Sequence, residues 1–189
     1  MRIGFFGDSF VLGIGDPDFK GWVGRLADSA GFTALNHGIQ GDTSTDVLKR
    51  WRAEADADKA DRLVFSFGAN DCLLTERKRI TVGQVDRLKN AKAIMMAARA
   101  QWPVLFISPL PIASDSAATN RIGEMARQLA TVAQINGAAY VNIFEAVKND
   151  PVWLQEAMAG DGAHPSNAGY SRVAELIKDH PVWQSWLKA

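Results

Sequence analysis

Apolar runs alternate along this chain with segments in which apolar residues recur every three or four positions. Five runs are apolar, β-branched or aromatic almost throughout, and they predict buried strands at residues 2–6, 33–36, 63–67, 104–108 and 139–144. A run of this kind without alternation is typical of a strand that is covered on both faces. The pattern therefore predicts five buried strands separated by helices.

The helices predicted between the strands have identifiable starts and ends. Their apolar positions run from Trp22 to Ala30, from Val47 to Trp51 after a Ser44/Thr45 cap, from Val82 to Ala98, from Ile122 to Val132 with an end near Gly137, and from Tyr170 to Ile177 after a Ser166 cap. Pro103 marks the end of the third helix.

Alternating strands and helices predict the α/β class, with a mostly parallel sheet covered by helices on both faces. No repeat, low-complexity tract or linker divides the chain, so we expect one domain over residues 1–189. Residues 109–118, rich in Pro, Ala and Ser, are expected to form a mobile loop. In such sheets ligands bind beyond the carboxyl ends of the strands.

The composition mainly excludes certain partners and structural features. The 189 residues are 47% hydrophobic and 22% charged, as in an ordinary globular protein. Twenty-one basic residues balance twenty-one acidic ones, so we expect no nucleic-acid partner and no stable membrane association. Cys72 is the one cysteine and cannot form an internal disulfide. Asp8 interrupts the apolar N-terminal stretch, which argues against a signal peptide, and a cytoplasmic location is expected.

Polar residues and glycines suited to catalysis follow several of the predicted strands. Ser9 comes after the first strand, Gly41 after the second and Asn70 after the third, while Asp161 and His164 lie in a loop before the last helix. Because parallel strands present their carboxyl ends at one edge of the sheet, we expect these residues to meet there.

Acyl transfer needs this set of groups: a nucleophile, a base, a residue that orients the base, and donors for the oxyanion. Ser9 carries the hydroxyl, and a histidine such as His164 is the usual base near neutral pH. Asp161 is three residues before His164, so one tight turn lets its carboxylate reach the imidazole. The backbone N–H groups of Ser9 and Gly41 and the amide of Asn70 can converge on one oxygen.

These segments resemble the SGNH hydrolases, also called GDSL-type lipases and esterases. The resemblance rests on GDS at 7–9, Gly41, GAND at 68–71 and DGAHP at 161–165, in family order. It implies a flavodoxin-like α/β/α sandwich of three layers with about five parallel strands. It also implies Ser9 as nucleophile, His164 as base and Asp161 as its partner, an oxyanion hole of Ser9, Gly41 and Asn70, and no cofactor or metal. Phe10 replaces the leucine of the motif.

The resulting hypothesis is a serine esterase that cleaves a small-molecule carboxylic ester, with a small acyl or aryl ester expected. Because the family is broad, a lysophospholipase, thioesterase or carbohydrate acetylesterase stays open, as do the acyl chain length, the leaving group and the oligomeric state. The loops at 72–80 and 109–118 are expected to shape the pocket. Outside the family, a flavin- or phosphate-binding module would share the same sheet.

Other residues are candidates for substrate contact. Asp8 is expected to hold the turn before Ser9, with substrate contact as the alternative, and Phe10 is a further candidate. Trp22 is proposed, with Trp153, for an acyl or aryl pocket. His37 precedes Gly41 and either lines the site or is structural.

Three further patterns imitate functional motifs. His180 follows Asp179 directly, a spacing that suits a carboxylate–imidazole pair less well than that of Asp161 and His164. The glycines in GIGDPD lack the third glycine of a dinucleotide fingerprint. Asp16 and Asp18 could bind Mg²⁺ in a phosphatase, although no third carboxylate is obviously placed to join them.

Overall fold

The computed structural model describes residues 1–189 as five strands, nine α-helices and one 3-10 turn. In chain order the elements are β1 (Arg2–Gly7), α1 (Ser9–Leu12), α2 (Gly21–Ala30), β2 (Thr33–Gly38), α3 (Ser44–Asp58), β3 (Arg62–Ser66), η1 (Asn70–Cys72), α4 (Gln84–Arg99), β4 (Val104–Ile107), α5 (Ser116–Ile135), β5 (Ala139–Val141), α6 (Phe144–Lys148), α7 (Pro151–Ala159), α8 (Asn167–Lys178) and α9 (Pro181–Lys188).

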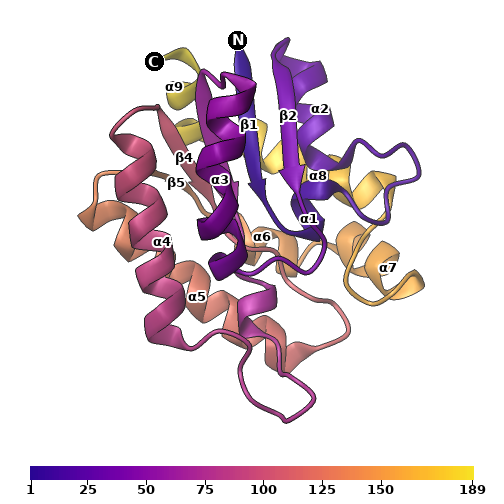
Figure 1. Cartoon of the computed structure of the whole chain (residues 1–189). Helices are drawn as coiled ribbons and strands as arrows, with labels where there is room; N and C mark the ends of the chain where they lie inside the picture. The colour runs from indigo at the N-terminus through magenta and orange to yellow at the C-terminus, as the bar shows by residue number, and fades with distance from the viewer.

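The five strands form one sheet in the order β2-β1-β3-β4-β5, and every neighbouring pair is parallel. This arrangement confirms the predicted parallel sheet of five strands and the α/β/α sandwich. Helices α3, α4 and α5 lie in front of the sheet in Figure 1, and α8 and α9 lie behind it. None of the helices is both long and apolar enough to span a membrane.

Each face of β1 packs against a different helical layer. Phe6 stacks on Phe65 of β3, and Trp51 of α3 meets the edge of that ring. Phe5, next in sequence, meets Trp22 of α2 on the other face. Because neighbouring residues of a strand point to opposite faces, two adjacent phenylalanines supply both halves of the core. Each fully buried phenylalanine contributes roughly 1.5–3 kcal/mol of transfer free energy.

The carboxyl end of β1 determines where the active-site loops begin. Gly7 pairs in register with Gly38 of β2 and with Ser66 of β3, so all three strands end at the same level. A Cβ at Gly7 would lie 1.9 Å from the carbonyl oxygen of Ser66, so only glycine allows the chain to pass there. The loops that carry Ser9, Gly41 and Asn70 therefore leave from one edge.

Several predicted boundaries shift. The last strand ends at Val141 and Phe144 begins α6. Helix α5 starts at Ser116, because Asp115 caps it by accepting the N–H of Ala118 at 2.8 Å, so the expected loop is shorter than residues 109–118. The actual N-cap of α3 is Thr43 rather than Ser44 or Thr45.

Four helices, α1, α6, α7 and α9, were not expected from periodicity. They span 4, 5, 9 and 8 residues, which is too short for a reliable apolar repeat. Two of them begin with proline, at Pro151 and Pro181, which is a favoured first position in a helix.

Candidate active site

Ser9 is the first residue of α1, directly after the carboxyl end of β1. The carboxylate of Asp8 caps this short helix by accepting the N–H of Phe10 at 3.0 Å. The first N–H groups of a helix have no partner within the helix, so the N–H of Ser9 is available as a donor. The turn thus places the hydroxyl and a backbone donor of one residue at the rim of the sheet.

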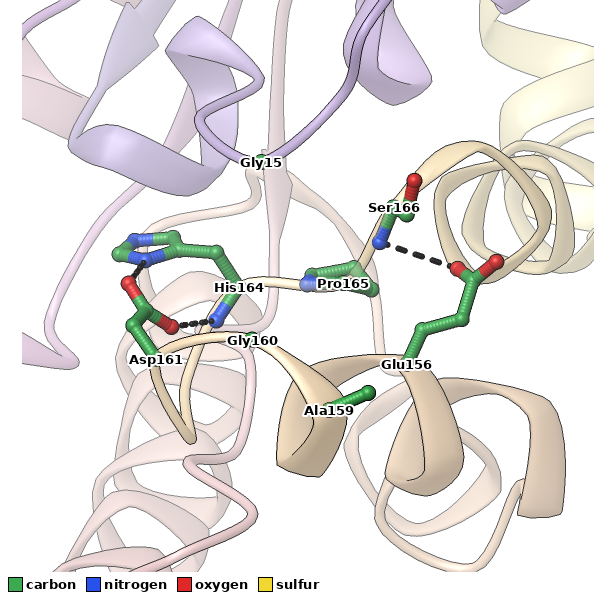
Figure 2. Close-up of a pocket in the computed structure, with 8 residues that line it drawn as sticks. All are labelled: Gly15, Glu156, Ala159, Gly160, Asp161, His164, Pro165 and Ser166. Carbon is green, nitrogen blue, oxygen red and sulfur yellow. Dashed lines mark hydrogen bonds and ion pairs between the residues drawn. The ribbon is translucent and has the colours of Figure 1, made fainter.

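Ser9, His164 and Asp161 are connected by hydrogen bonds, although 155 positions separate the first two in sequence. Ser9 Oγ lies 2.7 Å from His164 Nε2, and His164 Nδ1 lies 2.6 Å from Asp161 Oδ2. Figure 2 shows the Asp161 carboxylate turned toward the imidazole of His164. The three residue types and their order match a nucleophile–base–carboxylate triad.

The turn at residues 161–164 is held by the same carboxylate. Asp161 Oδ1 accepts the N–H of Ala163 at 2.9 Å and that of His164 at 2.8 Å. Partial burial alone would raise the pKa of Asp161, but the backbone and side-chain hydrogen bonds from His164 outweigh it and lower that pKa to about 2. Asp161 is therefore ionised at any pH at which the protein would be assayed.

Two aromatic side chains form a packed group next to the imidazole of His164. The ring of Phe10 lies 4.9 Å from that of His164 and 5.7 Å from that of Trp153, measured between centroids. Phe10 and Trp153 are buried, with 3% and 0% of their surface exposed. Phe10 packs against the His164 ring and Trp153 packs against Phe10, so both are part of the core next to His164, and their contact with substrate stays a prediction.

Glu156 belongs to this site although no motif in the sequence indicated it. Its carboxylate accepts the N–H groups of Ser166 at 3.0 Å, Ala168 at 3.2 Å and Gly169 at 2.7 Å. It thereby caps α8 from the neighbouring helix α7, and the hydroxyl of Ser166, the predicted cap, makes no such bond. Figure 2 shows Glu156 reaching the start of α8 just after His164 and Pro165.

Gly41 and Asn70 lie on two loops that contact each other. Asn70 Nδ2 donates to the carbonyl of Asp42 at 2.9 Å, which joins η1 to the residue after Gly41. Gly41 has φ of +84°, a left-handed conformation that favours glycine. The Asn70 amide has two N–H donors, so one remains for a ligand.

A buried carboxylate and a partly buried arginine fix these loops. Asp71, fully buried, accepts the backbone N–H of Ser44 at 2.9 Å and also the Ser44 hydroxyl. Arg50 of α3 donates to the carbonyls of Gly7 at 3.1 Å and His37 at 2.7 Å, and its Nε donates to Asp42 at 2.8 Å. Arg50 thus joins the ends of β1 and β2 to the loop that carries Gly41.

Asp8 is buried beneath this rim, with 2% of its surface exposed. Burial raises the pKa of Asp8 to about 7, and the nearby negative charge of Asp71 adds to the effect. The carboxyl group is thus close to half protonated near neutral pH. Its hydrogen bond to Phe10 makes it the cap of α1.

His37 and Trp22 lie away from the triad. His37 Nε2 is 2.7 Å from Asp58 Oδ2, and its ring stacks on Phe6, so it links β2 to α3 rather than lining the Ser9–His164 site. Trp22 is 1% exposed and packs against Phe5 inside the sandwich. For His37 the contacts therefore favour the structural alternative, whereas the expectation that Trp22 lines an acyl or aryl pocket is not supported, because its ring is enclosed in the core.

His180 and the Asp16/Asp18 pair have structural partners. His180 caps α9 by accepting the N–H of Val182 at 3.2 Å. Asp16 accepts the N–H of Gly21 at 2.7 Å and pairs with the Arg25 guanidinium; although burial alone would raise the pKa of Asp16, these hydrogen bonds lower it. Three or more His, Cys, Asp or Glu side chains do not cluster anywhere as metal ligands would.

A cavity of about 400 Å³ opens beside the triad, on the side of Asp161 and His164. Figure 2 shows its lining residues, Gly15, Glu156, Ala159, Gly160, Asp161, His164, Pro165 and Ser166. Ala159 is its only hydrophobic side chain, and Ser9 is not part of the lining. The hollow therefore lacks large hydrophobic side chains, although Pro165 and the carbon atoms of its polar residues add apolar surface.

Comparison with known proteins identifies related folds. A lipase/acylhydrolase from Enterococcus faecalis is 27% identical, with 99% of this chain and 96% of that chain covered and a TM-score of 0.74. Axe2, an acetylxylan esterase from Geobacillus stearothermophilus, has a TM-score of 0.77 at 20% identity over 93% of this chain and 91% of its own. At that identity the similarity establishes the fold alone.

Among curated proteins, YpmR of Bacillus subtilis (strain 168), described as uncharacterized, is 30% identical over 96 residues. The matched region is 46% of this chain and only 38% of the length of YpmR. The model of the GDSL-like Lipase/Acylhydrolase family matches residues 5–172, which include Ser9, Gly41, Asn70, Asp161 and His164. The chain therefore belongs to the GDSL-like Lipase/Acylhydrolase family.

Proposed function

We propose that this protein hydrolyses carboxylic esters through an acyl-enzyme formed on Ser9. The observation that carries the proposal is the unbroken series of hydrogen bonds from Ser9 Oγ through both ring nitrogens of His164 to Asp161. Membership of a family of lipases and acylhydrolases supports the reaction class.

In the proposed mechanism, Ser9 Oγ attacks the ester carbonyl while His164 Nε2 takes the hydroxyl proton. Asp161 keeps the other ring proton on Nδ1 and stabilises the imidazolium. His164 then gives the proton to the departing alcohol. A water molecule repeats the sequence on the acyl-enzyme and releases the carboxylic acid, which restores Ser9.

The oxyanion that forms on each attack needs donors on the opposite side of Ser9 from His164. The N–H of Ser9, the N–H of Gly41 and the free Asn70 amide hydrogen are the proposed donors. Their support is that Asn70 and Arg50 both bond to Asp42, which fixes the Gly41 loop before substrate binds. A preorganised donor is worth about 3 kcal/mol in the transition state.

We further propose short acyl groups as substrates. No large hydrophobic side chain lines the hollow next to His164, which suits a short acyl group better than a long alkyl chain. Acetylated carbohydrates belong to this class, and Axe2, with a similar fold, is described as an acetylxylan esterase. Thioesters and lysophospholipids are the competing substrates within the family.

The non-hydrolytic alternatives conflict with the charges at this rim. A flavin or phosphate cradle would place an anion near the carboxyl groups of Asp8, Asp42 and Asp71, where burial and the negative charges of Asp71 and Asp42 already raise the pKa of Asp8. The Mg²⁺-dependent phosphatase would need Asp16, which is paired with Arg25. Both features favour the esterase.

A fluorophosphonate probe with peptide mapping tests the nucleophile directly. We expect labelling at Ser9, no labelling in Ser9→Ala, and loss of p-nitrophenyl acetate hydrolysis in that variant without loss of folding. Ser114→Ala is the matched control, because Ser114 is an exposed serine whose backbone N–H bonds to Gly162 in the catalytic loop. Label on another residue, or full activity of Ser9→Ala, would reject the mechanism.

A substrate panel then tests the acyl preference. We expect kcat/KM to be highest for acetyl esters, including acetylated xylooligosaccharides, and to fall from butyryl to longer chains. A preference for a long-chain ester, a thioester or a lysophospholipid would refute the short-acyl proposal but leave the Ser9 mechanism intact. Activity should persist in EDTA, whereas a metal-dependent reaction would stop.

A further inference from the structure

A second cavity, of about 340 Å³, lies between the loop after η1 and helices α4 and α5. Its lining contains two arginines, the start of α4 and one acidic residue: Ile80, Gly83, Gln84, Arg87, Arg121 and Glu124. None of these belongs to the proposed triad or oxyanion hole. The cavity is therefore a separate feature of the molecule.

Arg87 is a buried cation without an acidic partner. Only 6% of its surface is exposed, and it forms no ion pair within 4.0 Å. Nη1 has the Cys72 thiol as a weak acceptor at 3.3 Å, while Nε is fully enclosed and has no partner. Buried charges in proteins are normally paired or bound to a ligand, because an isolated one is costly.

Arg121 approaches the same cavity from α5. Its Nε donates to the carbonyl of Cys72 at 2.7 Å, which orients the guanidinium, and its other two nitrogens make no hydrogen bond within the protein. Arg121 also forms no ion pair. The two arginines thus bring two positive charges to one cavity, with several donors unused.

The nearby acidic groups are already engaged or lie outside the lining. Glu124 accepts from Arg127 at 2.6 Å through one oxygen and from Gln128 at 3.1 Å through the other. Asp71 feels the charge of Arg87, but both its oxygens are held by Ser44. Asp86, in the first turn of α4, pairs with neither arginine and does not line the cavity.

We propose that this cavity binds a phosphate group, free or as a phosphomonoester, through the guanidinium groups of Arg87 and Arg121. Two guanidiniums carry a charge of +2, which a phosphate dianion neutralises and a monocarboxylate does not. Their planar N–H pairs match phosphate oxygens. The first N–H groups of α4 at Gln84, which receive no side-chain cap, face an anion favourably as an additional contribution.

The competing explanation is that both arginines only brace Cys72 at the end of η1. Bracing accounts for one nitrogen of each guanidinium, since Arg87 uses Nη1 and Arg121 uses Nε. It leaves Nη2 of Arg87, which is neither bonded nor enclosed, and the unused donors of Arg121 unexplained. A bracing role also predicts no response of the protein to phosphate, which makes the two explanations separable.

The test is calorimetric titration of the full chain near pH 7.5 with inorganic phosphate and, separately, with glycerol 3-phosphate. Sodium acetate at equal ionic strength is the control ligand. We expect one phosphate site per chain, with binding at least about tenfold weaker in Arg121→Met, the effect of losing a charged hydrogen bond. Arg77→Met is the matched control, since Arg77 is exposed on the same loop and lines no part of this cavity.

Each result decides the matter. Binding of inorganic phosphate, of glycerol 3-phosphate or of both supports the site and identifies which form of phosphate it takes. Support also requires that Arg77→Met binds as wild type does and that Arg121→Met binds more weakly. Absence of binding, equal binding by both variants, or an equal response to acetate overturns the proposal. If Arg121→Met does not fold, Arg121→Lys carries the comparison, because it keeps the charge and stem and loses the planar N–H pair.

Discussion

Replacing Asp8 with asparagine tests how a buried carboxyl group beside Ser9, the proposed nucleophile, affects stability. Asp8 has 2% of its surface exposed, and burial together with the charge of Asp71 raises its pKa to about 7. Asparagine retains an oxygen that can accept the N–H of Phe10, so the cap of α1 is preserved. The substitution therefore removes mainly the ionisable proton.

The sign follows from proton binding in the two states. The group has its ordinary pKa of 3.8 when unfolded and about 7 when folded, so the folded state binds more protons between these values and stability falls as pH rises. The full penalty above pH 7 is about 4 kcal/mol, and at pH 5 it is about 2 kcal/mol. Asp8→Asn should remove a pH-dependent loss of about 2–3 kcal/mol between pH 5 and pH 8.

The assay is urea unfolding of wild type and Asp8→Asn at pH 5, 6, 7 and 8. We subtract the free energy of unfolding of wild type from that of Asp8→Asn at each pH. This difference should increase by about 2–3 kcal/mol from pH 5 to pH 8. The exposed Asp179→Asn serves as control and should leave the pH dependence of wild type unchanged. A difference between Asp8→Asn and wild type that is the same at every pH would refute the reasoning.

Three further substitutions test the loops around Ser9. Asp161→Asn should lower kcat by about 10⁴-fold, because an amide cannot hold the proton on His164 Nδ1; steady-state kinetics at pH 7–8 measures this, and a loss below tenfold would contradict the role of the carboxylate. Asn70→Ala should lower kcat by about 10²–10³-fold with little change in KM, and a pure KM effect would exclude a transition-state donor. Arg50→Met should lower the free energy of unfolding by about 3 kcal/mol, because the carbonyls of Gly7 and His37 lose their donor and Asp42 loses its ion pair. Denaturant unfolding measures this loss, and a value below about 0.5 kcal/mol would contradict the prediction.

The sequence was sufficient for the central strands β1, β3 and β4 because each is apolar along almost its whole length and buried. Burial on both faces of a parallel sheet leaves no choice of register that exposes one side, so the runs are visible without tertiary information. The edge strand β2 contains Thr33, Asn36 and His37 and is mostly not buried, contrary to the prediction of a strand covered on both faces. Long helices such as α5 could be predicted because apolar residues recur every three or four positions along the face that they bury. Val85, with 64% of its surface exposed on α4, shows the limit, because an apolar residue at helical spacing can still face outward.

The order of the motifs also restricted the site. Ser9, Gly41 and Asn70 each follow a strand, and in a parallel sheet such positions meet at one edge. The short turn from Asp161 to His164 was predictable because the carboxylate can reach the imidazole locally, and the structure places these atoms 2.6 Å apart. Local sequence therefore specified the nucleophile turn and the base–carboxylate pair as separate pieces.

Only the tertiary structure decided which side chains support those pieces. Glu156 reaches α8 from α7, Arg50 reaches the ends of two strands from α3, and His37 faces Asp58 instead of the site. These contacts depend on which elements pack against each other, and the spacing of apolar residues predicts the elements but not their neighbours. Buried strands and helices can be predicted from the sequence because the spacing of apolar residues along the chain reflects which face is buried. The partner of a polar side chain cannot be predicted in this way, because it depends on which remote segment the fold brings within about 3 Å.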